Sequence, residues 1–337
     1  MHHPLQGAHG RDRRAYRRPR CIAADLRSRV SGLNRRHRIQ GHKLTSDLFD
    51  TAFAQYQAHG YAIVPGLLDA TLTASLRALT DRLMNDAVDD GDRNAVFDFE
   101  EGFDGGKPTV QRIKKPHRVD PFYFELAKHP ELVAFVQRIV GPGVRLNHSK
   151  INVKAARIGS SLEWHQDWAF APHTNMSTCV ASVMIDDASV ENGAMQVLPG
   201  SHRGPLYRHH DANDRFVGAI DPSTPGLDFS AAASLTGTAG TVAFHHPMTI
   251  HGSGLNRSGS HRRILFLEFA AIDAWPLFYH VEWNEYNSRI VAGEPSSTVR
   301  VEANPLTLPF PSEAGSSIYK TQSMVRSRFF DTAATAS

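Results

Sequence analysis

Apolar residues recur every three to four positions in three stretches of the first 140 residues. This spacing predicts helices over 48–57, 67–83 and 122–140. Asp69 is placed to cap the second helix, because a short carboxylate accepts hydrogen bonds from the free N–H groups of a first turn. The polar, glycine-rich segment 85–108 between the last two helices reads as a long loop.

The period of the apolar positions changes from about four to two near residue 144, which is typical of β-strands. Strand-like runs separated by turn signals such as Asn192-Gly193 follow, at 144–154, 162–168, 178–186, 194–198, 240–245 and 263–270. Helices first and many strands afterwards predict a mainly β fold, a double-stranded β-helix (jelly roll, cupin-like) with the N-terminal helices packed on its outside. The aromatic and proline-rich tail after Asp273 is expected to wrap the barrel or one of its mouths.

The composition is that of an ordinary globular enzyme. The 337 residues are 41% hydrophobic and 21% charged, and no apolar run approaches the length of about 18 residues that a membrane span requires. The two cysteines, Cys21 and Cys179, form no C-x-x-C motif and cannot build a disulfide framework. We therefore expect a cytoplasmic protein without a membrane partner.

The net charge of +3 is unevenly distributed along the chain. Residues 1–43 contain eleven Arg and one Lys against Asp12 and Asp25, so this segment carries +10 and the rest of the chain −7. A nucleic-acid-binding arm and a transit peptide are alternatives for such a segment, but the sequence lacks the serines and the amphipathic pattern of a transit peptide. We predict a basic, disordered extension over 1–43, a single domain over 44–337, and no nucleic-acid partner.

Two potential metal ligands, His165 and Asp167, lie two residues apart in a predicted strand. Alternate side chains of a strand point to the same face, so both are expected to aim at one point. His251 follows after several strands and offers a third ligand. Two imidazoles and one carboxylate with open positions are the ligand set of non-haem Fe(II) oxygenases, although catalytic zinc sites use similar sets.

Arg262 opens a strongly apolar strand, where an unpaired charge is unfavourable. No acidic residue adjoins it, so a carboxylate-bearing co-substrate would explain its position. His245 and His246 are alternative ligands, but their place before Pro247 at a strand end favours a structural or indirect role. The basic stretch that begins at Arg112 is read as a solvated loop, with contact to an anionic ligand as the alternative.

The order of these motifs from about Phe53 to Ala270 resembles the phytanoyl-CoA dioxygenase family of Fe(II)/2-oxoglutarate oxygenases. The motifs that carry the resemblance are Trp164-His-Gln-Asp-Trp168, Glu191-Asn-Gly-Ala-Met-Gln-Val-Leu-Pro-Gly-Ser-His202, His251-Gly-Ser-Gly254 and Arg262. The resemblance implies that His165, Asp167 and His251 bind iron. It also implies that Arg262 and Ser253 hold the distal carboxylate of 2-oxoglutarate.

The same resemblance implies hydroxylation of an unactivated C–H bond of a small organic metabolite, with decarboxylation of 2-oxoglutarate to succinate. Fe²⁺, 2-oxoglutarate and O2 are then required, ascorbate supports activity, and no catalytic side chain is needed beyond the metal centre. Relatives that halogenate replace the carboxylate ligand with a small residue, so Asp167 favours hydroxylation. The alternatives are another metal-dependent enzyme on a cupin-like barrel (a zinc hydrolase or isomerase) and a non-catalytic binding module.

Overall fold

The structure is a computed structural model that describes residues 46–88, 95–100, 108–311, 317–325 and 328–332. The predicted extension 1–43 lies outside the described residues, all of which belong to one unit of the chain. Every helix in the described ranges is too short or too polar to cross a bilayer.

The predicted helices form, with one break. The described α-helices are α2 (Ser46–His59), α3 (Ala70–Asn85), α4 (Pro116–Val119), α5 (Pro121–Ala127), α6 (Pro130–Val140), α7 (Trp283–Asn287), α8 (Ile318–Gln322) and α9 (Phe329–Thr332). Asp69 caps α3 as predicted, and its side chain accepts a hydrogen bond from Leu72 N at 2.7 Å. The prediction of a single helix over 122–140 is wrong. The segment forms two helices, α5 and α6, because Pro130 disfavours helical geometry at the residue before it.

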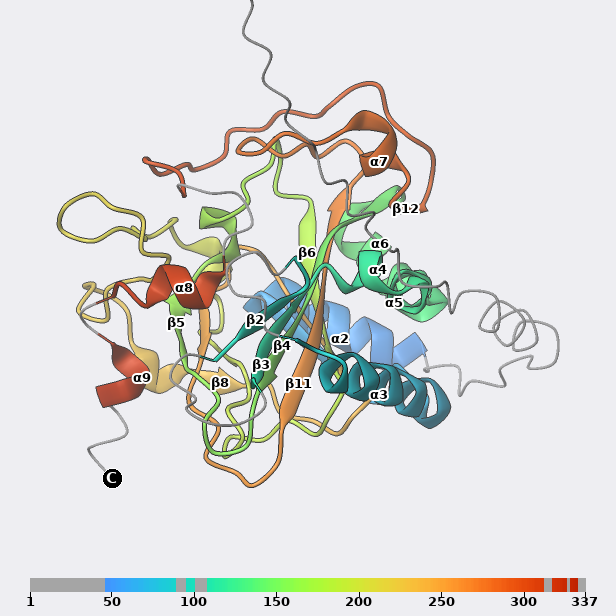
Figure 1. Ribbon diagram of the computed structural model, residues 1–337. Helices are drawn as coiled ribbons and strands as arrows, with labels where there is room; N and C mark the ends of the chain where they lie inside the picture. The colour runs from blue at the N-terminus through green and yellow to red at the C-terminus, as the bar shows by residue number, and fades with distance from the viewer. Residues whose placement is uncertain (1–45, 89–94, 101–107, 312–316, 326–327, 333–337) are drawn as a thin grey trace, which may run out of the picture. The chain divides into compact units, whose positions relative to one another are not determined.

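The strands pair into two sheets (Figure 1). The large sheet has the order β1-β9-β6-β11-β4-β3-β2, with β12 also beside β4, and the small sheet has the order β5-β10-β7-β8. The strand bounds are β1 Tyr61–Val64, β2 Phe97–Phe99, β3 Val110–Lys114, β4 Val144–Lys154, β5 Leu162–His165, β6 Thr178–Met184, β7 Gln196–Val197, β8 Ala233–Ser234, β9 Val242–His245, β10 His251–Ser253, β11 Arg262–Ala271 and β12 Ile290–Ala292. All these strand pairs are antiparallel, and most neighbouring strands are far apart in the chain, as in a jelly roll.

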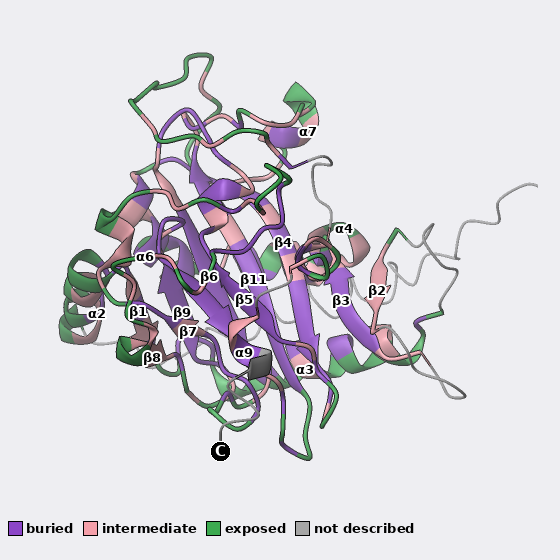
Figure 2. Cartoon of the chain, turned by 90° about the vertical axis from the view of Figure 1, so that its left-hand side faces the viewer, coloured by how far each residue is buried: buried purple, intermediate pink, exposed green. Residues whose placement is uncertain are grey.

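Helices cover one face of the large sheet, and the small sheet faces the other. The main hydrophobic core lies between α2, α3, α5, α6 and the sheet, and contains fully buried side chains such as Leu76, Phe135 and Phe244. The central strands β6, β9 and β11 of the large sheet are almost continuously buried, whereas β2 at its edge is only half-buried (Figure 2). A second apolar cluster that includes Met195 and Phe266 lies between the two sheets. The predicted arrangement of helices outside the sheets is confirmed.

Two further sequence predictions need correction. The strand predicted over 162–168 ends at His165, and Asp167 begins a 3₁₀ turn, Asp167–Ala169. The predicted loop 85–108 contains strand β2, which pairs with β3. The C-terminal tail returns to the small sheet, where α8 and α9 contact β5 (Figure 1).

Candidate metal centre

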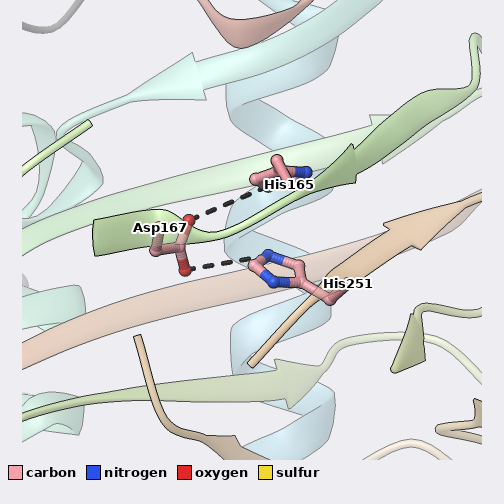
Figure 3. Close-up of side chains that lie close together, drawn as sticks. All are labelled: His165, Asp167 and His251. Carbon is pink, nitrogen blue, oxygen red and sulfur yellow. Dashed lines mark ion pairs between the residues drawn. The ribbon is translucent and has the colours of Figure 1, made fainter. Parts of the chain in front are cut away.

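His165, Asp167 and His251 converge on one point (Figure 3). The two histidines are direct partners in the antiparallel pair β5–β10, so the register of these strands places the two rings side by side. Asp167 Oδ1 lies 3.8 Å from His165 Nε2, and Asp167 Oδ2 lies 3.7 Å from His251 Nε2. One ligand atom from each residue falls within 4.8 Å of the others. The three residues that the sequence analysis selected are therefore brought together, although Asp167 is held by a turn and not by the strand.

Backbone carbonyls select the tautomer of both histidines. His165 Nδ1 lies 2.7 Å from Glu163 O, and His251 Nδ1 lies 2.9 Å from Thr249 O. Each Nδ1–H donates to its carbonyl, so each Nε2 keeps a free lone pair that points toward Asp167. A hydrogen bond of this kind behind a ligand histidine is the usual outer support of a metal site.

Burial puts the three groups in the protonation states that metal binding needs. Burial and the neighbouring His251 hold the pKa of His165 well below its ordinary value. Burial also lowers the pKa of His251 to about 4. Burial alone would raise the pKa of Asp167, but the charge of His251 and the hydrogen bond from His245 hold it well below its usual range. Neutral imidazoles and an ionised carboxylate are the metal-binding forms.

The separations of these atoms fit a transition metal. Metal bonds of about 2.1 Å at right angles place neighbouring ligand atoms about 3 Å apart, so separations of 3.7 and 3.8 Å need only a small contraction. Two imidazole nitrogens and one carboxylate oxygen form the facial ligand set of non-haem Fe(II) oxygenases.

His245 contacts the carboxylate ligand from outside the cluster. Its Nε2 lies 3.0 Å from Asp167 Oδ2, and its side chain is fully buried. This contact orients Asp167 toward the two ligand histidines. His246, the other alternative ligand, instead lies beside Tyr56 and His202. Of the two histidines that precede Pro247, one supports the site and the other belongs to a separate cluster.

Arg262 and Ser253 line the same cavity as the three metal-ligand candidates. Arg262 is only 2% exposed, and its Nε has no hydrogen-bond partner in the structure. Burial lowers the pKa of Arg262 to about 10, so the guanidinium remains charged at neutral pH. The cavity measures about 30 Å³ and is lined by Lys150, Asn152, Leu162, His165, Asp167, Met195, His251, Gly252, Ser253, Arg262, Phe266 and Ile318.

The sequence analysis missed several residues of this cavity. Lys150 lies on β4 and pairs with Glu268 at 3.1 Å, and both point between the sheets. The alternation of β4 places Lys150 and Asn152 on the same face of the strand, so this pattern could have identified Lys150 as a residue of the cavity. Arg112 lies in strand β3 and is 5% exposed, so the reading of its stretch as a solvated loop is wrong for Arg112. Ile318 carries no signal, because its position depends on how the distant tail folds back.

Comparison with known proteins agrees with this geometry. The sequence model of the phytanoyl-CoA dioxygenase (PhyH) family matches residues 56–264. A probable alpha-ketoglutarate-dependent hypophosphite dioxygenase of Stutzerimonas stutzeri is 33% identical over 280 residues, which cover 82% of this chain and 98% of that protein.

Two solved structures show the same fold. EctD from S. alaskensis with bound Fe has a TM-score of 0.57 at 24% identity, over 75% of this chain and 86% of its own. The epimerase SnoN, in complex with Fe3+, alpha ketoglutarate and nogalamycin RO, has a TM-score of 0.56 at 21% identity, over 79% of this chain and 98% of its own. The predicted jelly-roll fold is therefore confirmed.

Fold, site and relatives together define an iron-dependent dioxygenase that uses 2-oxoglutarate as co-substrate. The chain belongs to the phytanoyl-CoA dioxygenase family. The resemblance inferred from the motifs is thereby confirmed, and the reading as a non-catalytic module is set aside.

Proposed function

We propose that His165, Asp167 and His251 bind Fe(II), and that Arg262 and Ser253 hold the distal carboxylate of 2-oxoglutarate. The observation that carries this proposal is the buried, unpaired Nε of Arg262 in the cavity that the metal-ligand candidates line. An unpaired buried guanidinium is unfavourable, and a planar carboxylate is the partner that its fork fits.

The chain's own residues prepare the site for this chemistry. The carbonyls behind His165 and His251 fix both rings, and His245 orients Asp167. Leu162, Met195 and Phe266 line the cavity and exclude water from it. When bound, iron with O2 and 2-oxoglutarate supplies the oxidant, while 2-oxoglutarate is decarboxylated to succinate. No side chain then has to act as a general acid or base.

The proposed reaction is hydroxylation of an X–H bond in a small substrate. Asp167 occupies the third ligand position and so leaves no place for a halide. The structurally similar SnoN is an epimerase, so a site of this fold can also support a different reaction. Whether hydroxylation occurs therefore depends on the substrate that is bound. An unactivated C–H bond of a small organic metabolite is the first candidate for the bond that is oxidised.

A P–H bond is the second candidate, and hypophosphite is its simplest source. The support is the Stutzerimonas stutzeri relative, which matches 82% of this chain over nearly its own whole length and is described as a probable hypophosphite dioxygenase. The narrow cavity suits so small a substrate, and the ammonium group of Lys150 lines it beside Asp167. Lys150 is thus the residue that we expect to attract a small anion toward the metal.

Succinate release tests the reaction class and the substrate together. Purified protein is incubated with Fe(II), ascorbate and 2-oxoglutarate, and either hypophosphite or a panel of C–H substrates is added. Stoichiometric succinate with phosphite detected by ³¹P nuclear magnetic resonance assigns the P–H reaction, and hydroxylated product from the panel assigns the C–H reaction. An Asp167→Ala variant is expected to lose iron and turnover, and full activity in that variant would contradict the proposed ligand set.

A spectrum separates this proposal from a zinc hydrolase or isomerase. Anaerobic addition of 2-oxoglutarate to the Fe(II)-loaded protein is expected to give a weak visible charge-transfer band, which zinc cannot produce. A protein that hydrolyses substrate with zinc alone and shows no such band with iron would contradict the oxygenase assignment of this site.

A further inference from the structure

Helix α8 is fixed directly against the strand that carries His165. Gln322 at its end is 3% exposed and makes three hydrogen bonds to backbone groups. Its Oε1 accepts from Glu163 N at 2.8 Å, and its Nε2 donates to Glu163 O at 3.2 Å and to Gly218 O at 2.8 Å. The helix therefore holds a defined position beside β5, as Figure 1 also shows. This part of the chain lies beyond the segment that the family model matches.

The first residue of α8 reaches the cavity, and the second follows it directly in the helix. Ile318 lines the cavity together with Arg262 and Ser253. The hydroxyl of the next residue, Tyr319, is buried and has no hydrogen-bond partner in the structure. A buried hydroxyl is normally paired, so an unpaired one beside a ligand cavity indicates a partner that binds there.

Two arginines and the carboxylate of Glu100 act on Tyr319 electrostatically. Its electrostatic neighbours include Arg262 and Arg112, and the Nε atoms of both guanidiniums are likewise buried without a hydrogen-bond partner. Burial raises the pKa of Tyr319 above its ordinary value, although both arginines act in the opposite direction. The phenol is therefore protonated at neutral pH and can donate. Tyr319, Arg262 and Arg112 thus each bring a buried donor without a hydrogen-bond partner, and an anion bound beside Arg262 would offer an acceptor.

We propose that Tyr319 is a binding residue for 2-oxoglutarate, and that its hydroxyl donates a hydrogen bond to the distal carboxylate that Arg262 pairs with. This inference rests on the proposed function, because it assigns a further contact in the same co-substrate site. The C-terminal helix then completes the pocket that the two sheets leave open at Arg262.

The Tyr319→Phe variant tests the hydroxyl alone, since it keeps the ring that packs in α8. The readout is anaerobic titration of 2-oxoglutarate into Mn(II)-loaded protein, followed by calorimetry, so that no turnover is involved. The dissociation constant for 2-oxoglutarate is expected to rise about tenfold, which is the usual effect of losing one hydrogen bond to a charged group. In turnover, the KM for 2-oxoglutarate should rise likewise, with kcat unchanged at saturating 2-oxoglutarate.

A matched ligand and a matched variant separate binding from a structural role. 2-Oxopentanoate has the same chain length but a methyl group in place of the distal carboxylate, so Tyr319→Phe should leave its affinity unchanged. Tyr123→Phe removes a hydroxyl that bonds Thr80 in the helical layer at 3.1 Å. That variant is expected to lower the melting temperature without changing the affinity for 2-oxoglutarate.

The outcomes distinguish this inference from the function on which it rests. Equal weakening of 2-oxoglutarate and 2-oxopentanoate by Tyr319→Phe, or no weakening of either, overturns the role of Tyr319. If Arg262→Ala weakens 2-oxoglutarate strongly while Tyr319→Phe does not, the proposed function stands and only this inference fails. If Arg262→Ala also leaves 2-oxoglutarate binding intact, the co-substrate site itself is wrongly placed.

Discussion

Asp167 has neighbours for both carboxylate oxygens before any metal ion binds. Oδ1 faces His165, and Oδ2 faces His251 and accepts from His245. Three histidines surround this one carboxylate, and their residue type alone does not show which of them are the metal-ligand candidates. Their hydrogen bonds distinguish them: the Nδ1 atoms of His165 and His251 are taken by carbonyls, whereas the Nε2 of His245 is taken by Asp167 itself.

The contact from His245 predicts a graded effect on iron affinity. His245→Ala removes the donor that orients Asp167 and should weaken Fe(II) binding by about 10-fold or more, as loss of such supporting contacts usually does. His245→Gln keeps an N–H donor and should retain part of the affinity. Anaerobic Fe(II) titration measures both variants. Unchanged iron affinity in His245→Ala would show that the hydrogen bond from His245 is not needed to orient Asp167.

At the scale of elements, the site depends on how closely β5 and β10 approach each other. Gly252 lies between His251 and Ser253, and a Cβ atom there would come 2.9 Å from Leu162 O and 2.8 Å from the ring of Phe330. The glycine thus permits the spacing that brings His251 and Ser253, the residues of β10 proposed to bind iron and 2-oxoglutarate, against β5.

We therefore expect Gly252→Ala to push β10 away from β5. The variant should bind Fe(II) and 2-oxoglutarate about tenfold more weakly and lose about 1–3 kcal/mol of stability, as overpacked sites do. Gly259→Ala is the matched control, because a Cβ at Gly259 meets nothing within 4 Å. Metal titration and urea denaturation of the two variants check this. Equal metal affinity and equal stability of the two variants would show that the space between β10 and β5 can accommodate a Cβ atom at Gly252.

The docking of α8 is a second feature at this scale. Gln322→Ala leaves buried backbone groups of Glu163 and Gly218 without partners, so the free energy of unfolding should fall by about 3 kcal/mol. The affinity for 2-oxoglutarate should fall as well, since α8 carries Ile318. Ser323→Ala, at an exposed neighbour, should change the stability by less than about 0.5 kcal/mol in the same urea experiment. A Gln322→Ala protein as stable as the parent would indicate that α8 is held by apolar contacts alone.

The periodicity of the sequence predicted the longer helices and most of the longer strands, because amphipathic spacing is a local property. The break at Pro130 and the early end of β5 at His165 were missed for different reasons. The break follows from a local rule about the residue before a proline, but the regular apolar spacing of 122–140 favoured one continuous helix. The second depends on a distant contact, since Trp168 N donates to Pro247 O at 3.0 Å in the turn that follows.

At the scale of the whole molecule, burial of neutral histidines links stability to pH. Burial lowers the pKa of His173 to about 4, and burial with the nearby Arg289 lowers the pKa of His117 to about 4. An unfolded histidine titrates near 6.5, so the unfolded chain takes up protons first as the pH falls. Stability is then full above about pH 6.5, declines between pH 6.5 and 4, and levels off below pH 4.

Each of these histidines should contribute a loss of about 3 kcal/mol across that pH range. Urea denaturation of the metal-free protein from pH 8 to pH 4.5 measures the slope. His173→Gln removes one titrating group and should flatten the profile. An unaltered slope in that variant would mean that His173 has the same pKa in the folded and the unfolded protein.

The basic segment 1–43 is predicted to take no part in turnover. All the residues proposed for the metal centre and for 2-oxoglutarate lie between His165 and Tyr319, and the described core begins at Ala52. A protein that starts at Leu44 should show kcat and KM values equal to those of the full chain. A drop in turnover on removing 1–43 would assign the segment a role in catalysis.

The sequence by itself determined the residue types of the site and the order of the strands that carry them. His165, Asp167 and His251 could be selected by residue type and spacing, and Arg262 because a charge that opens an apolar strand needs a partner. Only the tertiary structure decided which groups surround them. The contact of His245 with Asp167 and the place of Lys150 in the cavity arise from strand register, and the position of Tyr319 arises from a tail folded back over β5. Such contacts join residues far apart in the chain, and local spacing carries no information about which of them will meet.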